Sequence, residues 1–376
     1  MSVNVSEPGG VALAPDRSHL QQLIEEIVDS GFLGITLRVR DRHSEWVGSA
    51  GLAELGGTAP PPIDGHFRIG SNTKPFTATL VLQLVAAGKL GLDDPVRDHL
   101  PEFWLDPGIT VRMLLQHTSG VFNFSGEYAA DGTVDPGIPI PYGSAGAEWV
   151  DLRFKTYPLE ELARLALSKP ARFAPGTSWS YSNTNYVLAR LLIERVAGRP
   201  FAEVLQKLIL EPLGMSGTVA PGAAPEIPDP HAHGYYRFGD PDSPQTIDVT
   251  RHNPSWNSSG GDMIATTGDL GTFVSGLLGG KLLPADLRTE MCTPHSTGIP
   301  DMGYGLGLFV STTDGGATVV SHNGGTVGYA ALMYGTPDGS RTLTAGLNLV
   351  DDAGMSLATA FQRTQRKLVG TVFDES

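Results

Sequence analysis

The chain has 376 residues, which is enough to bury a substantial hydrophobic core in one large domain or in two interleaved ones. Its single cysteine, Cys292, excludes an intrachain disulfide, a C-x-x-C redox pair and a cysteine-rich zinc site. The 26 Lys and Arg are outnumbered by 40 Asp and Glu, and the resulting formal charge of −14 excludes nucleic acid and anionic membranes as favoured partners.

The first predicted elements are a helix and two strands. Residues 19–31 place apolar side chains at helical spacing, whereas residues 34–42 and 44–51 alternate as strands do. The stretch before them has no basic region followed by an apolar run, and no apolar run elsewhere approaches the length of a membrane span. We therefore expect no membrane partner and a cytoplasmic protein, or a secreted one if a leader was removed.

A buried helix is predicted over residues 73–90. Phe76, Leu80 and Leu84 recur at the spacing of one helical face. This helix begins directly at Ser71, so the hydroxyl of that serine lies at a helix N-terminus.

The rest of the chain divides into helical patterns, loops and short strands. Further helices are predicted over residues 110–120, 158–168, 186–198, 269–280 and 355–370. Alternating runs predict antiparallel strands at residues 305–311, 317–323, 331–336 and 341–350. Gly and Pro predict loops over residues 126–146 and 221–254.

The order of these elements predicts the domain organisation. Helix and strands occur at both ends of the chain, with a mainly helical block between them. We expect an α/β lobe, of the α+β kind, from residues 17–70 and 262–376, with an antiparallel sheet flanked by the terminal helices. The inserted, mainly helical lobe takes residues 71–261, and the active site is predicted between the two lobes.

Ser71 and Lys74 form an S-x-x-K motif at the start of the predicted helix. At this spacing the two side chains share one face, one turn apart, so that the lysine amine can reach the serine oxygen. A serine hydroxyl is a weak nucleophile until a neighbour takes its proton, and lysine can do so only if its pKa is lowered. Because the tetrapeptide alone is common at protein surfaces, this chemistry needs further residues to support it.

Two further motifs follow in the sequence. Tyr181-Ser182-Asn183 provides a second acid/base hydroxyl and a side-chain amide just before a predicted helix. The segment His322-Asn323-Gly324-Gly325 lies in a predicted strand. Taken separately, Tyr181 could be a core tyrosine and His322 an ordinary strand histidine, but the set of three motifs in order is far more specific.

In this order and spacing the motifs resemble those of the serine β-lactamase and penicillin-binding-protein family, with its class C β-lactamases, D-alanyl-D-alanine carboxypeptidases, esterases and D-aminopeptidases. FRIGSNTKPFTATLVLQLVAAGKLGLDDPV, ITVRMLLQHTSGV, FAPGTSWSYSNTNYVLARLLIERVAGRPF, PLGM and GYGLGLFV resemble family segments in family order. The chain looks most like the secreted actinomycete carboxypeptidases. The resemblance covers nearly the whole chain and implies a β-lactamase/transpeptidase-like fold.

The resemblance also implies roles for individual residues. Ser71 would form the acyl-enzyme, Lys74 would receive or orient its proton, and Tyr181 would relay a proton to the leaving group. The backbone N–H groups of Ser71 and Gly325 would form the oxyanion hole. The residues that it places along the substrate are Asn183, Trp256, His322, Asn323, Gly324 and Phe309. For Trp256, packing inside a loop is an equally good interpretation.

The chain departs from this pattern where the similar carboxypeptidases bind a substrate carboxylate. They carry an arginine directly after GYGLGL and hydroxyl residues in the H-x-G segment, whereas this chain has Phe309, Asn323 and Gly325 there. A phenyl ring cannot pair with a carboxylate, so strict carboxypeptidase activity is called into question. By sequence, Arg68 and Arg251 are the nearest arginines that could replace the missing one.

The function predicted from these residues is that of a serine hydrolase or acyltransferase, which forms a Ser71 acyl-enzyme from an amide, an ester or a D-amino-acid-containing peptide. The alternatives are a D-alanyl-D-alanine carboxypeptidase or β-lactamase, a peptide-releasing cyclase or transacylase of secondary metabolism, and a catalytically silent penicillin-binding-like sensor. An α/β-hydrolase is excluded because G-x-S-x-G is missing. His231 and His233 have no evident third ligand, so neither metal nor cofactor is expected. The acyl acceptor and the oligomeric state stay open.

Overall fold

The computed structural model describes residues 18–128, 133–240, 242–258 and 260–374. The polar N-terminal stretch, including the first residue of the predicted α/β lobe, lies outside the described residues. Within them, the predicted mixed α/β architecture with an antiparallel sheet and terminal helices is confirmed. The division into two lobes with residue limits stays a prediction.

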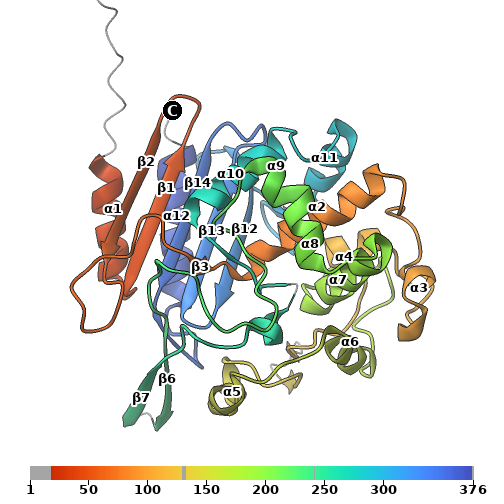
Figure 1. Cartoon of the computed structure of the whole chain (residues 1–376), viewed down its shortest axis with the longest axis horizontal. Coiled ribbons are helices and arrows are strands. Elements are labelled where there is room, and N and C mark those ends of the chain that lie inside the picture. The colour runs from red at the N-terminus through yellow and green to blue at the C-terminus, as the bar shows by residue number, and fades with distance from the viewer. Residues whose placement is uncertain (1–17, 129–132, 241, 259, 375–376) are drawn as a thin grey trace, which may run out of the picture.

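The main feature is an eight-stranded antiparallel sheet in the order β2-β1-β14-β13-β12-β11-β10-β9 (Figure 1). Its strands are β1 (Gly34–Arg40), β2 (Glu45–Gly51), β9 (His295–Ile299), β10 (Met302–Tyr304), β11 (Phe309–Thr312), β12 (Thr318–Thr326), β13 (Tyr329–Gly335) and β14 (Thr342–Asn348). In the register of the sheet, Gly34 lies opposite Asn348, so strands from the two ends of the sequence are joined next to the edge strand β2.

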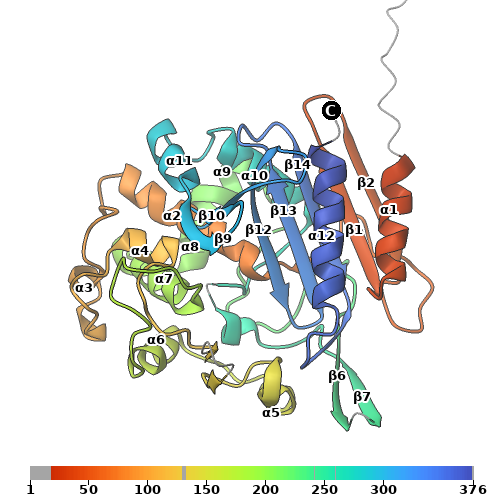
Figure 2. The ribbon, with the colours of Figure 1, turned by 180° about the vertical axis from the view of Figure 1, so that it is seen from behind.

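Helices cover both faces of this sheet. Figure 2 shows α1 (Ser18–Asp29) and α12 (Ala358–Phe373) on one face, and α10 (Thr267–Leu278) packs on the other. β13 is buried along its whole length because its side chains alternate between two faces and both faces are covered. Ala330, Leu332 and Tyr334 belong to the core on the α12 side, while the residues between them belong to the second core.

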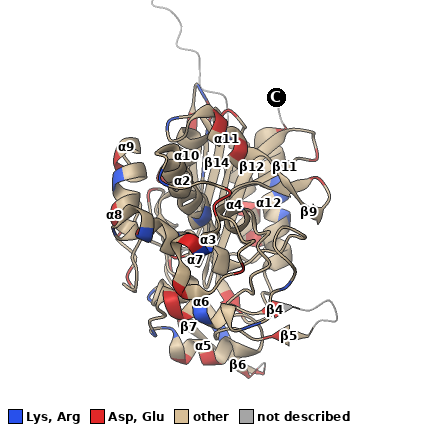
Figure 3. Ribbon diagram, turned by 90° about the vertical axis from the view of Figure 1, so that its right-hand side faces the viewer, with Lys and Arg blue, Asp and Glu red and all other residues tan. Residues whose placement is uncertain are grey.

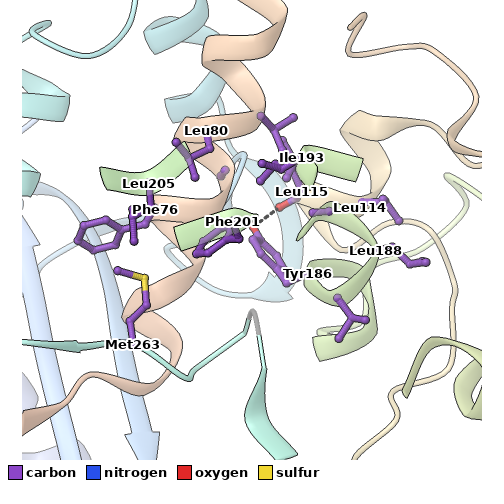
Figure 4. Close-up of a cluster of buried hydrophobic side chains, with 14 of the residues drawn as sticks. Phe76, Leu80, Leu114, Leu115, Tyr186, Leu188, Ile193, Phe201, Leu205 and Met263 are labelled. Carbon is purple, nitrogen blue, oxygen red and sulfur yellow. Dashed lines mark hydrogen bonds between the residues drawn. The ribbon is translucent and has the colours of Figure 1, made fainter. Parts of the chain in front are cut away.

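The second core lies among the helices of the central part of the chain. These helices are α2 (Thr73–Ala86), α3 (Val96–His99), α4 (Val111–Gln116), α5 (Gly146–Leu152), α6 (Leu159–Leu167), α7 (Asn183–Ala197), α8 (Phe201–Leu205), α9 (Glu211–Leu213) and, further along the chain, α11 (Ala285–Cys292). Figure 4 shows Phe76 and Leu80 of α2 in the same cluster as Tyr186 and Ile193 of α7. The Tyr186 hydroxyl donates a hydrogen bond to the carbonyl of Leu115 at 2.9 Å, which ties α7 to α4.

Some of the predicted elements differ from the structure. The predicted loop over residues 221–254 is wrong in part, because β6 (Tyr235–Asp240) and β7 (Ser243–Asp248) form a hairpin that extends from the molecule in Figures 1 and 2. β15 (Val350–Asp352) pairs in parallel with β6. The two-residue strands β3 (Phe67–Arg68), β8 (Ile264–Ala265), β4 (Glu127–Tyr128) and β5 (Val134–Asp135), together with β9 and β10, were not anticipated. Short, polar strands such as β7 lack the apolar alternation that identifies a strand.

Positions of Lys or Arg and of Asp or Glu are interspersed along the ribbon of the helices in Figure 3. In α6, Glu160 and Glu161 precede Arg164 by one turn, and in α7 Arg190 pairs with Glu194 at 3.4 Å. Among the described residues, no helix combines the length and the apolar composition required to cross a bilayer.

Candidate active site

Ser71 is held at the junction between β3 and α2. The 3-10 turn η1 (Gly70–Asn72) leads directly into α2, as the sequence predicted. Gly70 has φ +50°, and a Cβ at this position would lie only 2.6 Å from the backbone nitrogen of Gly325. Glycine is therefore required at residue 70 both by its left-handed backbone and by the close approach of β12.

The structure brings together the three residues predicted to be catalytic. Lys74 Nζ lies 3.0 Å from Ser71 Oγ, and the Tyr181 hydroxyl lies 2.9 Å from the same oxygen. Lys74 and Ser71 share one helical turn, whereas Tyr181 comes from the segment just before α7. The serine oxygen thus has one acid/base group on each side within hydrogen-bonding distance.

Lys74 is fully buried and is held by neutral groups. Its Nζ donates to Asn183 Oδ1 and to the carbonyl of Gly260, both at 2.8 Å. Burial lowers the pKa of Lys74 well below its ordinary value, and the charge of Asp262 opposes this shift only in part, since Asp262 pairs with Arg190 at 2.9 Å. A neutral amine at this position has a lone pair directed to Ser71.

Tyr181 is buried in a cluster of aromatic rings. Its ring centroid lies 4.3 Å from that of His117, and the Lys74 Nζ lies 4.7 Å from the Tyr181 ring centroid. Burial raises the pKa of the Tyr181 phenol, while the hydrogen bond with Ser71 lowers it less. The phenol is therefore protonated at neutral pH, which makes Tyr181 a proton donor.

His117, which lies in the segment ITVRMLLQHTSGV, contacts the ring of Tyr181 and the backbone beside it. It ends α4 at φ 63° and is completely buried. Its Nδ1 accepts a hydrogen bond from the backbone N–H of Ser182 at 3.2 Å, which fixes the segment that carries Tyr181 and Asn183. The segment resembles family segments in sequence, but no residue pattern in it predicts this contact.

The backbone of β12 lies against the turn that carries Ser71. A Cβ on Gly324 would lie 1.9 Å from the carbonyl oxygen of Ile69 and 3.0 Å from the nitrogen of Ser71, so this position must be glycine. A Cβ on Gly325, by contrast, would meet nothing within 4 Å. The backbone nitrogens of Ser71 and Gly325 therefore lie near each other where η1 meets β12, and their role as oxyanion-hole donors remains a prediction.

His322 is a buried, neutral residue of the same strand, two positions before Gly324. Its Nδ1 lies 2.7 Å from the carbonyl of Asn323, and its Nε2 lies 3.2 Å from the Tyr304 hydroxyl, an arrangement that suits an Nδ1–H tautomer. Burial lowers the pKa of His322 to about 3, with a further contribution from Lys74. The ring of Phe309 lies 5.3 Å from that of His322, so apolar and uncharged groups line this side.

Replacing His322 by glutamine is expected to flatten the dependence of the free energy of unfolding on pH. The pKa of about 3 in the folded state lies below the usual value of 6.5, so the unfolded chain binds one more proton between these pH values. The contribution of His322 to the free energy of unfolding is therefore complete above about pH 6.5. It is lost as the pH falls towards 3, by up to about 1.4 kcal/mol per pH unit. Denaturant unfolding at pH 6, 5 and 4, with His43→Gln as a surface control, measures both slopes. Equal slopes in wild type and His322→Gln would contradict this assignment.

The other residues predicted to line the site have different surroundings. Trp256 lies in the turn η5 (Pro254–Asn257), is 6% exposed and makes an edge-to-face contact with Trp149 at 5.9 Å. Asn323 pairs with Leu332 and so faces α12, on the opposite side of β12 from Gly324. The substrate-binding roles of Trp256 and Asn323 stay predictions, and the contacts of Trp256 are those of a packing residue.

The two arginines considered as carboxylate ligands are engaged elsewhere. Arg68 is 2% exposed and donates to the carbonyls of Pro225, Thr250 and His252 at 2.7 to 3.1 Å. Arg251 forms an ion pair with Glu226 at 2.9 Å, and both side chains are largely exposed.

The histidine pair of the β6 region has carboxylate neighbours. His233 Nδ1 lies 2.7 Å from Asp248, and His231 Nδ1 lies 3.2 Å from Asp229. Within the described part of the chain, no group of three or more His, Cys, Asp or Glu side chains is arranged to hold a metal ion.

Comparisons with known proteins identify the family of the chain. A family profile described as Beta-lactamase matches residues 20–366. A D-stereospecific amidohydrolase from Streptomyces sp. is 34% identical, and its structure superposes with a TM-score of 0.80 over 93% of this chain and 98% of that chain.

Two further relatives have names that differ from that of the amidohydrolase. A penicillin-binding protein of Bacillus subtilis is 28% identical over 347 residues, which cover 89% of this chain and 72% of that protein. Esterase EstB of Burkholderia gladioli is 38% identical over 193 residues, which cover 49% of this chain and 46% of that protein. The chain is therefore a member of the beta-lactamase family, the serine hydrolases and acyltransferases that share this mixed α/β fold.

Proposed function

We propose that this protein hydrolyses amides or esters of D-amino acids, or transfers their acyl group, through an acyl-enzyme on Ser71. The observation that carries the proposal is the position of Ser71 Oγ between a buried amine and a buried phenol, at 3.0 and 2.9 Å. A silent binding protein would have no use for a fully buried lysine beside a serine hydroxyl. The amidohydrolase with 34% identity supports amides of D-amino acids as the substrate class.

The different pKa shifts of the two groups assign their roles in acylation. Lys74, neutral because of its burial, takes the proton of Ser71 as Oγ attacks the carbonyl carbon of the substrate. Tyr181, whose pKa is raised, gives its proton to the leaving nitrogen or oxygen as the bond to the carbonyl carbon breaks. The proton on Lys74 then restores the phenol, and Ser71 is left as an ester.

The carbonyl oxygen of the substrate becomes negatively charged during the attack. We place it between the N–H groups of Ser71 and Gly325, which the contact of Gly70 with Gly325 holds next to each other. Each such donor contributes about 3 kcal/mol to transition-state stabilisation in related reactions. Asn183, fixed by Lys74 and by the hydrogen bond from its N–H to Asn123 at 3.1 Å, is placed to bind an amide of the acyl group. Water or an amine then attacks the ester and releases Ser71.

Intact-protein mass spectrometry tests this proposal directly. The protein is mixed with D-phenylalanine methyl ester, its L enantiomer and penicillin, and quenched in acid after milliseconds to minutes. We expect a mass gain of one D-phenylalanyl group, which digestion of the quenched protein should locate on the peptide that contains Ser71, and a much slower gain with the L enantiomer. Turnover of the D ester without any adduct on this peptide, or labelling of another residue, would refute the Ser71 acyl-enzyme.

Substrates without a free carboxylate beside the scissile bond are expected to react at least about tenfold faster, by kcat/KM, than acyl-D-Ala-D-Ala. Phe309 and the neutral His322 line this side, while Arg68 is bound to three carbonyls. A carboxylate buried without a cationic partner loses its hydration without compensation. The measurement compares kcat/KM for acyl-D-Ala-D-Ala, its C-terminal amide and an ester of the same acyl group.

The variant Phe309→Arg sharpens this comparison. It places a guanidinium where the similar carboxypeptidases have one, so it should raise activity on the free acid and leave the amide and the ester nearly unchanged. A wild-type preference for the free acid would contradict the prediction and favour a carboxypeptidase.

A further inference from the structure

A cavity of about 240 Å³ adjoins β12 on the side of α12. We call it the α12 cavity. Its apolar wall includes Phe32, Met355 and Phe361, and its polar wall includes Tyr142 and Asp351. Gly325, the proposed oxyanion-hole residue, lines the same cavity, so the α12 cavity begins within one residue of the reacting centre.

The α12 cavity adjoins a stretch of β12 that lacks a strand partner on one side, although the turn η1 packs against it there. β11 pairs with β12 from Thr318 to Ser321, and in the described chain no strand is paired with this edge from His322 onwards. Gly325 has no side chain to close the passage, and the space where its Cβ would lie is empty for 4 Å. A substrate held at the N–H of Gly325 can therefore extend around the edge of β12 into the α12 cavity.

Asp351 is the unusual group in this wall. It is 8% exposed, and it accepts hydrogen bonds from the Tyr142 hydroxyl at 3.2 Å, from the N–H of Asp352 at 2.9 Å and from the backbone N–H of Gly328, all of them neutral donors. No Lys or Arg nitrogen of the described residues lies within 4 Å of it. Burial raises the pKa of Asp351 to about 6, so the carboxylate is ionised at neutral pH without a cationic partner. A cation in the α12 cavity would compensate this buried charge.

We propose that the α12 cavity binds an apolar arm of the acyl group, and that this arm ends in a positively charged nitrogen held by Asp351. The leaving group must lie at the Tyr181 hydroxyl, on the side of β12 opposite to α12. The group that turns to the α12 side is therefore the acyl side chain. This inference rests on the proposed function and names the side chain that the enzyme prefers.

The length of the arm follows from the sheet. β14 is two strands away from β12, a separation of roughly 10 Å at about 4.8 Å per strand, and β15, which carries Asp351, follows β14 directly in the chain. A lysine side chain together with its hydrogen bond covers a distance of this order. Phe32, Met355 and Phe361 would pack against the methylene groups of such an arm.

The test compares D-lysine p-nitroanilide with D-norleucine p-nitroanilide, which differ by the terminal ammonium group. At pH 8 we expect kcat/KM to be at least about tenfold higher for the lysine substrate. Asp351→Asn should reduce this ratio to about one and leave the norleucine rate nearly unchanged. Asp352→Asn, which removes the neighbouring charge outside the cavity wall, is the matched control and should keep the ratio.

The pH dependence of the ratio provides a second measurement on the wild-type protein. Tyr142, Tyr236 and Asp352 are the titratable groups that act on Asp351, and both tyrosines are neutral in this range. The ratio should therefore fall towards one as the pH drops from 8 to 5, whereas loss of the Lys74 base affects both substrates equally. This measurement decides the matter even if Asp351→Asn does not fold.

The outcomes separate the two proposals. Turnover of both substrates with a ratio near one, or a ratio that survives in a folded Asp351→Asn variant, overturns the role of the α12 cavity and leaves the Ser71 acyl-enzyme intact. Failure of both substrates, together with the absence of a Ser71 adduct, overturns the proposed function and this inference with it.

Discussion

Ser71→Ala is expected to abolish turnover and covalent labelling, with a loss of kcat of at least four orders of magnitude. The change removes the only atom of the site that would bond to the acyl carbon, and groups that act together with a nucleophile lose most of their effect without it. Lys74 keeps its hydrogen bonds to Asn183 and Gly260, so the free energy of unfolding should change by no more than about 1 kcal/mol. Steady-state kinetics beside a denaturant curve measure both quantities.

Ser182→Ala is the matched control for this change. Ser182 is also buried, lies next to Asn183 and precedes α7 without capping it through its side chain, so its hydroxyl has no role in the proposed chemistry. This variant should retain activity within a few-fold. Residual activity of a folded Ser71→Ala protein above one thousandth of wild type would mean that another group is the nucleophile.

Lys74→Met is expected to slow acylation by two to four orders of magnitude, the range that general acid/base groups contribute. Methionine matches the length of the lysine stem but has no lone pair on nitrogen to accept the Ser71 proton. The wild-type rate should fall as the pH drops below the lowered pKa of Lys74, because the protonated amine cannot act as a base. Stopped-flow measurement of the acylation burst between pH 5 and 9 gives the rate and its acid limb.

Two further variants test the assignment of the base. Lys74→Arg keeps N–H donors for Asn183 and Gly260 but remains charged at all accessible pH values, so it should be as slow as Lys74→Met. The double variant Lys74→Met with Tyr181→Phe should acylate faster than the product of the two single rate losses predicts. The reason is that both groups act on the same Ser71 oxygen. Wild-type acylation in Lys74→Arg would show that Lys74 only orients the serine.

The catalytic residues were predictable from sequence to different degrees. The spacing of Ser71 and Lys74 alone predicts that they meet, since a helix brings residues three apart onto one face. Tyr181 and Asn183 are more than one hundred residues away, and only the resemblance to a known family joined them to Ser71. The hydrogen bond from Lys74 to Gly260 could not be foreseen, because any residue offers a backbone carbonyl.

The fold shows the same division. The long helices and the strands β12 to β14 were predicted because apolar periodicity depends on local sequence. The β6–β7 hairpin was missed, since most of its side chains are exposed and its sequence carries charge and proline. The α12 cavity joins Tyr142, Asp351 and Gly325 from three distant segments, and no local pattern marks a space that arises from tertiary packing.

The pairing of β1 with β14 has a consequence for synthesis of the protein. Because Gly34 lies opposite Asn348, the β1–β2 hairpin leaves the ribosome long before the strand that completes its sheet. During translation the inner edge of β1 remains an unpaired template for other chains, and the apolar face that α1 partly covers is incomplete. Nascent chains should therefore aggregate more and depend more on chaperones when translation is slowed between β1 and β14. In the finished protein the edge of β1 is paired and the apolar face is covered.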